Sequence, residues 1–162
     1  MANPAKRDRD VAQAFALTEL RTFRLSGGTP YALVSHNPEA GVISDFWLGS
    51  FGSQAEFRTV LEFIAGEIEA GRYCLWLADL RYMSTGFAES NEWLVGDLMP
   101  RVLKGGLVRE AVVLTQDSGV PEGYDVFGSA TGALRRIADG RVRGFTDIAA
   151  ARAWLTDGEL PG

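Results

Sequence analysis

Two patterns of hydrophobic positions recur along the chain, short apolar runs and longer segments in which apolar residues follow helical spacing. The apolar runs predict strands at residues 31–35, 42–48, 73–78, 111–115 and 142–145. Residues 20–25 form either one more short strand or an extended lead-in. Between the first two runs, residues 37–41 are rich in turn formers and predict a β-hairpin.

Helical spacing predicts a helix after most of these strands. The predicted helices begin at Ser53, at Ser90 or Asn91, at Tyr124 and at Ile148. In the first of them, Phe57, Ile64 and Ile68 share one face, while charged residues occupy the other faces. Pro100 is expected to kink or restart the second helix, because proline donates no backbone hydrogen bond.

The order of these elements predicts an α/β fold. An N-terminal antiparallel hairpin is followed by parallel β-α units, which gives a mixed sheet of about five strands with helices packed on it. Residues 73–78 are apolar at nearly every position and are expected to form the central strand, with Cys74 as inert packing inside it. We expect a single domain at residues 19–157, a flexible N-terminal arm at residues 1–18 and a C-terminal tail at residues 158–162. The alternative for the arm is a short helix that packs onto the body through Val11, Phe15 and Leu17.

Composition and charge favour a cytoplasmic protein without nucleic-acid partners. The chain has 162 residues, 46% of them apolar, which suits one compact domain with an ordinary core. The net charge of −5 argues against a nucleic-acid binder, since phosphate neutralisation needs a concentrated basic face. No apolar segment follows the polar N-terminus, so we expect neither a signal peptide nor membrane insertion.

The common catalytic and cofactor signatures are missing from the sequence. A single histidine, His36, and a single cysteine, Cys74, cannot build a metal centre or an internal disulfide. No Gly-x-Ser-x-Gly elbow, P-loop or Gly-x-Gly-x-x-Gly fingerprint occurs. We therefore expect no enzyme activity, no metal and no cofactor.

Polar residues gather after the central strand, where open α/β sheets place their functional loops. Asp79 and Arg81 are two residues apart, so they point to the same face and form either a structural ion pair or the frame of a polar pocket. The candidate interaction or ligand surface comprises Asp79, Arg81, Tyr82, Gly86, Asn91, Glu92 and Trp93. It spans the loop and the start of the helix that follows.

Several short motifs, in their order and spacing, resemble the STAS-like family, which includes bacterial anti-sigma-factor antagonists and is grouped with lipid-transfer (CRAL-TRIO) domains. The motifs are Trp47-Leu48-Gly49, Ala78-Asp79-Leu80-Arg81, Glu92-Trp93-Leu94 with Pro100-Arg101, Arg109-Glu110-Ala111-Val112-Val113, and Phe145-Thr146-Asp147 before Ala153-Trp154-Leu155. The resemblance covers residues 30–156 and implies a STAS-like domain.

In the antagonists of that family, phosphorylation of a serine in the loop after the equivalent strand controls binding to a partner kinase. The resemblance implies that Ser84 or Thr85 is the phospho-acceptor, although Met83 stands where an acidic residue is usual. A phosphate adds about −1.5 to −2 charge, which brings repulsion and a desolvation cost at a packed interface. The alternative is that Ser84, Thr85 and Gly86 are ordinary turn residues.

Two functions follow as hypotheses. The first is a non-enzymatic regulatory domain in bacteria that binds a protein partner and forms a homodimer. In this hypothesis, phosphorylation in the loop after the central strand controls binding of the partner. The second is a carrier of a small apolar ligand or lipid, and it predicts a cavity lined by Trp47, Trp76 or Trp93.

Overall fold

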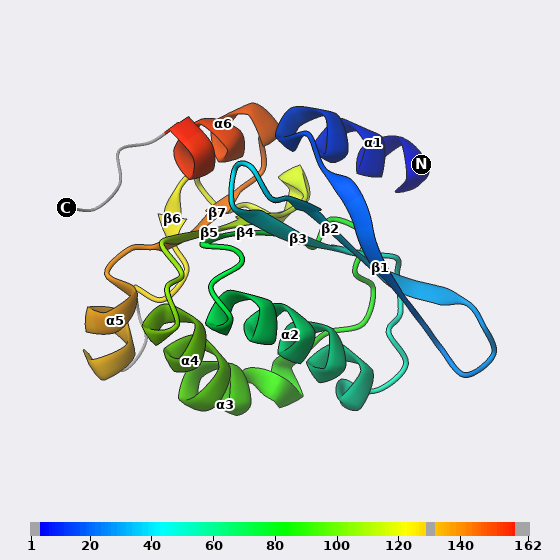
Figure 1. Cartoon of the computed structure of the whole chain (residues 1–162), viewed down its shortest axis with the longest axis horizontal. Coiled ribbons are helices and arrows are strands. Elements are labelled where there is room, and N and C mark those ends of the chain that lie inside the picture. Colours follow the sequence, from blue (N-terminus) through cyan, green and yellow to red (C-terminus); the bar gives the residue numbers. More distant parts are fainter. Residues whose placement is uncertain (1–3, 129–131, 158–162) are drawn as a thin grey trace.

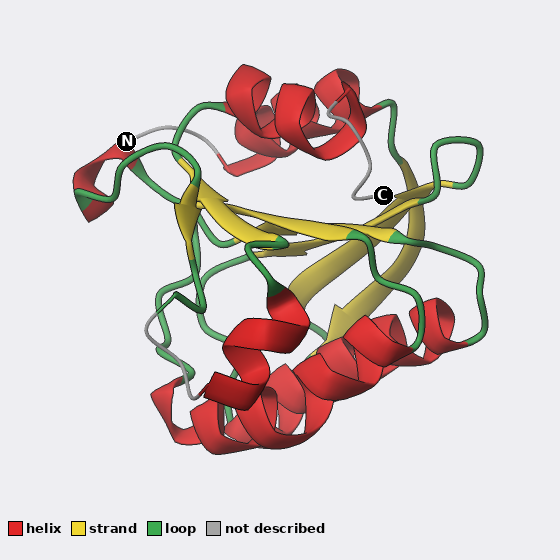
Figure 2. Cartoon of the chain, turned by 90° about the vertical axis from the view of Figure 1, so that its left-hand side faces the viewer, coloured by secondary structure: helices red, strands yellow, loops and turns green. Residues whose placement is uncertain are grey.

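A mixed sheet lies between two layers of helices in the computed structural model, which describes residues 4–128 and 132–157 (Figure 1, Figure 2). The helices are α1 Pro4–Phe15, α2 Gln54–Glu69, α3 Asn91–Trp93, α4 Met99–Lys104, α5 Gly132–Ala138 and α6 Ile148–Arg152. The strands are β1 Thr18–Arg24, β2 Pro30–Asn37, β3 Val42–Trp47, β4 Leu75–Asp79, β5 Arg109–Val113, β6 Tyr124–Asp125 and β7 Val142–Phe145. Helices α1 and α6 cover one face of the sheet, and α2 to α5 cover the other.

The strand order in the sheet is β1-β2-β3-β4-β5-β7-β6. The pairs β1–β2, β2–β3 and β6–β7 are antiparallel, whereas β3, β4, β5 and β7 pair in parallel. The predicted hairpin followed by parallel units is therefore confirmed. The predicted number of strands was too low, because the described part of the sheet contains seven strands, including β1 and β6.

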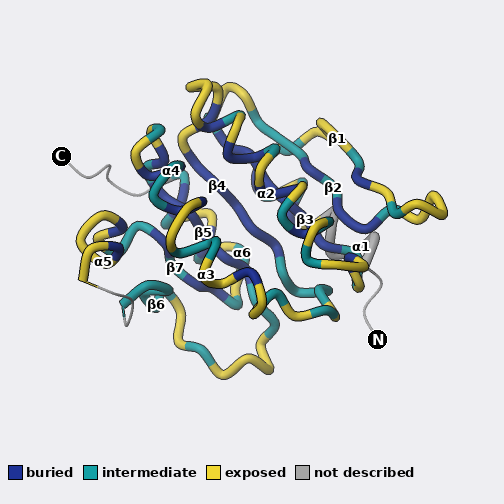
Figure 3. Tube along the Cα trace, turned by 90° about the horizontal axis from the view of Figure 1, so that it is seen from below, coloured by how far each residue is buried: buried dark blue, intermediate teal, exposed yellow. Residues whose placement is uncertain are grey.

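The alternation of side chains along the strands builds two separate cores. Ile43, Trp76 and Val112 pack toward α2 and α4, while Leu77 and Val113 pack toward α1 and α6. Strand β4 lies in the middle, and all five of its residues are buried. Figure 3 shows this strand as a continuous buried segment beneath α2. The prediction of a central strand covered on both faces is confirmed.

The segment that begins at Tyr124 is not the long helix that its pattern suggested. Tyr124–Asp125 instead pairs with β7, and helix α5 begins at Gly132. The phenol ring of Tyr124 occupies the space over Gly144, where a Cβ atom would come within 1.9 Å of the ring. This edge strand depends on a contact with a distant glycine, which helical spacing in the local sequence does not reveal. Residues 129–131 of the predicted helix lie outside the described residues.

Residues 1–18 were predicted to be a flexible arm, with the alternative that a short helix packs onto the body, and residues 4–15 form helix α1 on the sheet. The side chains of Val11 and Phe15 are buried and contact the core on the α6 side. Burial of these two side chains favours docking of the helix, although its mean composition is polar. Residues 1–3 of the predicted arm and the predicted tail, 158–162, lie outside the described residues.

The prediction that Cys74 is buried inside the central strand was wrong. Strand β4 begins at Leu75, and the Cys74 thiol is exposed. The backbone N–H groups of Cys74 and Leu75 both donate to the Gly41 carbonyl, at 3.0 Å each. Regular pairing with β3 starts only after this shared acceptor, so the cysteine remains outside the covered part of the strand.

Candidate functional site

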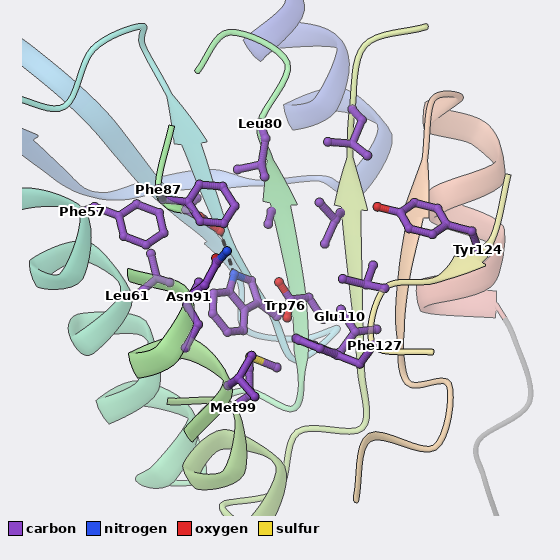
Figure 4. A pocket seen from close by; sticks show the side chains of 18 residues that line it. Phe57, Leu61, Trp76, Leu80, Phe87, Asn91, Met99, Glu110, Tyr124 and Phe127 are labelled. Carbon is purple, nitrogen blue, oxygen red and sulfur yellow. Dashed lines mark hydrogen bonds between the residues drawn. The ribbon is translucent and has the colours of Figure 1, made fainter. Parts of the chain in front are cut away.

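A cavity of about 400 Å³ lies between the sheet and the helical layer of α2, α3 and α4 (Figure 4). Its apolar lining includes Phe57, Leu61, Phe87, Met99, Val112 and Phe127. Its polar lining groups belong to Asp45, Trp76, Asn91, Glu110 and Tyr124. Asn91 is the exposed member of the described lining, so we place the mouth of the cavity at the start of α3.

The sheet register brings three of these polar residues together. Trp76 on β4 pairs with Glu110 on β5, and Asp45 on β3 pairs with Ala78, two residues beyond Trp76. Residues paired across parallel strands point to the same face, and so do residues two apart along one strand. Asp45, Trp76 and Glu110 therefore all line the cavity from the sheet. Figure 4 shows two of them, Trp76 and Glu110.

The Asp45 carboxylate is held by two indole groups. The Nε1–H of Trp76 donates to its Oδ1 and the Nε1–H of Trp47 donates to its Oδ2, each at 2.7 Å. Asp45 is only 2% exposed, and burial raises the pKa of its carboxyl group to about 6 despite both indole hydrogen bonds. Because this pKa lies below neutral, Asp45 is mainly ionised at pH 7.

The Glu110 carboxyl group is equally buried but has a different environment. It is 6% exposed, and no hydrogen bond from any described residue reaches it. Burial raises the pKa of Glu110 well above its usual range, and the neighbouring charge of Asp45 raises it further. Burial and the charge of Asp45 thus both favour the protonated form of Glu110, whereas the two indole hydrogen bonds favour the charged form of Asp45.

No lysine, arginine or histidine is among the described residues that line the cavity. The remaining polar groups, the Asn91 amide and the half-buried Tyr124 phenol, are uncharged at neutral pH. The charge of Asp45 therefore has no cationic side chain beside it within the cavity wall. This arrangement can accept hydrogen bonds and positive charge in an otherwise apolar space.

The helical wall of the cavity contains an irregular turn. Leu94 and Val95 line the cavity from a π-helical turn, Leu94–Leu98, in which the Met99 N–H donates to the Leu94 carbonyl. Pro100 follows directly and has no N–H to continue the α-helical pattern, so the predicted break of this helix is found here. Such π turns occur frequently at functional sites.

Polar contacts fasten the segment beside the mouth to α2. The Gln54 side chain donates to the Gly86 carbonyl at 3.1 Å and accepts from the Ser90 hydroxyl at 2.7 Å. The rings of Phe57 and Phe87 stack with their centroids 4.9 Å apart. These contacts hold Phe87 over one side of the cavity.

Asp79 and Arg81 lie on the opposite face of the sheet from this cavity. Arg81 donates from Nε to Asp79 Oδ1 at 2.9 Å and from Nη2 to Asp79 Oδ2 at 2.7 Å. Its Nη2 also contacts Asp10 of α1 at 3.2 Å. The structure contains the ion pair, which joins the strand end to the N-terminal helix, and Arg81 also lines a polar pocket with Gln116 and Asp117.

The other predicted surface residues are spread around the start of α3 and the preceding loop. Asn91 lines the cavity, whereas Glu92 is exposed and Trp93 lies under the guanidinium group of Arg58, 5.4 Å from the ring centroid. Tyr82 packs edge to face on the ring of Phe46, with 5.9 Å between the centroids. The predicted surface is therefore not a single cluster.

The predicted phospho-acceptors lie at the tip of the loop after β4. Ser84 is exposed, and its backbone N–H donates to the Gly49 carbonyl at 3.0 Å. The Thr85 hydroxyl donates to the Ser50 hydroxyl at 2.8 Å and is half-buried. The loop is thus anchored to the segment that follows β3, with the Ser84 side chain facing solvent.

Sequence reasoning did not select Asp45 or Glu110 as functional residues. The available signal was one carboxylate in the middle of each of two strands that are otherwise covered on both faces. Acidic residues are rarely fully buried without partners, so such positions are informative. Of the three tryptophans expected near a cavity, Trp76 lines it, while Trp47 supports it through Asp45.

Two features are absent from the part of the chain that the structure describes. No three histidine, cysteine, aspartate or glutamate side chains gather closely enough to hold a metal ion. None of the helices has both the length and the apolar character needed to cross a bilayer.

Comparisons with known proteins leave this site without a precedent to draw on. The chain matches no protein-family model, no curated protein and no solved structure.

Proposed function

We propose that this chain binds a small, largely apolar molecule in the cavity between the sheet and helices α2 to α4. The observation that carries the proposal is the cavity itself, about 400 Å³ in volume and lined mainly by aliphatic and aromatic side chains. Ligand pockets typically measure about 300–1,000 Å³ and combine an apolar wall with a few converging polar groups. Asp45 and Glu110 are the converging groups here.

Filling the cavity is expected to weaken binding. Ala78 lies on its floor, so Ala78→Phe would place a ring where the ligand sits. Binding of n-octanol, a simple apolar probe, is expected to weaken by about tenfold or more in this variant. Titration calorimetry measures the affinity.

Ala149→Phe is the matched control, because Ala149 is exposed on α6 at the other face of the sheet. It should leave octanol binding unchanged. Thermal unfolding verifies that both variants are folded. Equal octanol affinity of the wild type and the folded Ala78→Phe variant would exclude this cavity as the binding site.

A second candidate function is a non-enzymatic regulatory domain that binds a protein partner, and it draws on the resemblance to STAS-like domains. The exposure of Ser84 favours it, because a modifying enzyme needs access to the hydroxyl group. Thr85 is a poorer phospho-acceptor, since its hydroxyl group donates a hydrogen bond to the Ser50 hydroxyl. The surface would comprise the loop after β4 and the start of α3, and the partner could also be a second copy of the chain.

Ser84→Asp is expected to change partner capture in a quantitative pulldown while the midpoint of thermal unfolding stays within a few degrees of the wild type. The reason is that an exposed loop position tolerates charge, whereas an interface packed against it does not. Ser118→Asp, at another exposed position, is the control. Capture of the same partners in the same amounts by wild type and Ser84→Asp would argue against a switch at this residue.

A further inference from the structure

We propose that the ligand of this cavity is an amine with an apolar body, whose ammonium group is bound between Asp45 and Glu110. This inference rests on the proposed function, and it narrows that function to one chemical class. It stands on three features of the site: the charge on the floor, the open hydrogen-bond acceptor and the apolar wall.

The charge on the cavity floor calls for a positive partner. Asp45 is buried, and no cationic side chain lies among the described residues of the lining. Its two indole partners fix the carboxylate in place but carry no charge. A buried charge without an oppositely charged partner is costly. One ammonium group would pair with Asp45 and remove this cost.

The hydrogen-bonding capacity of the floor fits the same group. An ammonium group has three N–H donors and no acceptor, so it needs oxygen atoms around it. Glu110 offers a carboxyl oxygen to which no described residue donates, and the two indole hydrogen bonds do not use all the lone pairs of the Asp45 carboxylate. Both residues are neighbours of Trp76. Glu110 pairs with Trp76 across the sheet, and Asp45 accepts a hydrogen bond from the Trp76 indole.

The same floor disfavours anionic ligands. A fatty-acid carboxylate or a phosphate group would meet Asp45 in a site of low dielectric with no cation to offset the repulsion. A neutral alcohol would fit sterically but would leave the charge of Asp45 unpaired. The body of the ligand would contact apolar residues of the helical layer, such as Phe57, Phe87 and Met99.

Three probes with one tail test the inference: n-octylamine, n-octanol and n-octanoate, titrated calorimetrically at pH 7. Octylamine is expected to bind about tenfold or more tightly than octanol, because only the amine makes charged hydrogen bonds to Asp45. Octanoate is expected to bind most weakly. The double variant Asp45→Asn/Glu110→Gln should bind octylamine and octanol equally, while octanol affinity changes little.

A variant outside the cavity floor serves as the matched control. Glu92→Gln removes an exposed carboxylate near the mouth and should behave as the wild type, which excludes adsorption to the acidic surface. The wild-type comparison of the three probes remains decisive even if the double variant fails to fold.

The outcomes separate the two proposals. If octanol or octanoate binds as tightly as octylamine to the wild type, the amine inference is wrong and the proposed cavity function stands. If the amine preference survives in the folded double variant, the carboxyl pair is not its origin and the inference is wrong. If none of the probes binds, the proposed function fails together with the inference.

Discussion

Replacing Arg81 by methionine is expected to destabilise the fold by about 3–5 kcal/mol, the range measured when one member of a buried ion pair is removed. Asp79 is 0% exposed, and Arg81 donates two side-chain hydrogen bonds to its carboxylate. Methionine has a similar length but no charge, so Asp79 would keep only the backbone N–H of residue 81, at 3.2 Å. Urea unfolding of the wild type and the variant at pH 7 measures the loss.

Two further variants identify the buried pair as the cause. Asp10→Asn weakens the contact between Arg81 and the half-exposed side chain of α1, and should cost only about 0–1 kcal/mol. Asp79→Leu with Arg81→Met removes both charges together and should recover much of the stability, because an apolar pair often replaces a buried ion pair at little cost. Equal losses in Arg81→Met and Asp10→Asn would contradict this account.

The central elements of the fold could be predicted because their signals are local. Strand β4 is apolar at nearly every position, which is typical of a strand with two covered faces. Helix α2 shows both its apolar face and its N-terminal cap, since Ser53 and Glu56 form the capping box. Each of these signals lies within one helix or one strand, so it can be recognised from sequence alone.

The parts predicted wrongly or left open depend on contacts between distant segments. Helix α1 was foreseen only as an alternative, because the pattern of its own residues does not identify the sheet face that buries Val11 and Phe15. Strand β6 has only two residues and depends on the space over Gly144. Cys74 stays exposed because pairing with β3 starts one residue later.

The candidate site was missed for a similar reason. The functional residues were predicted at a strand end, at Asp79 and Arg81, whereas the two acids of the cavity lie within strands β3 and β5. A lone acid in a strand is visible in sequence, but its partner is not, because the register of three strands brings Asp45, Trp76 and Glu110 together. Asn91 was the one predicted surface residue that reaches the cavity.

Asp45 should make the stability of the wild type depend on pH in a direction opposite to that of a salt-bridged acid. Its pKa rises from an ordinary 3.8 to about 6 in the folded protein, mainly through burial. The folded state therefore binds the proton more tightly than the unfolded state does. The contribution of Asp45 is most favourable below pH 3.8, declines as the pH rises to about 6, and is lost above that pH.

Asp45→Asn removes this contribution, so the stability difference between variant and wild type should shift by about 2–3 kcal/mol in favour of the variant between pH 4 and pH 7. The loss of an indole hydrogen bond also changes the stability of the variant. That change does not depend on pH, so the shift with pH is still expected. Urea unfolding of both proteins at unit steps of pH measures it. Asp117→Asn, the same change at an exposed position, should show no comparable shift. A difference between Asp45→Asn and wild type that stays constant with pH would show that burial does not raise the pKa of Asp45, which would then be fully ionised at pH 7.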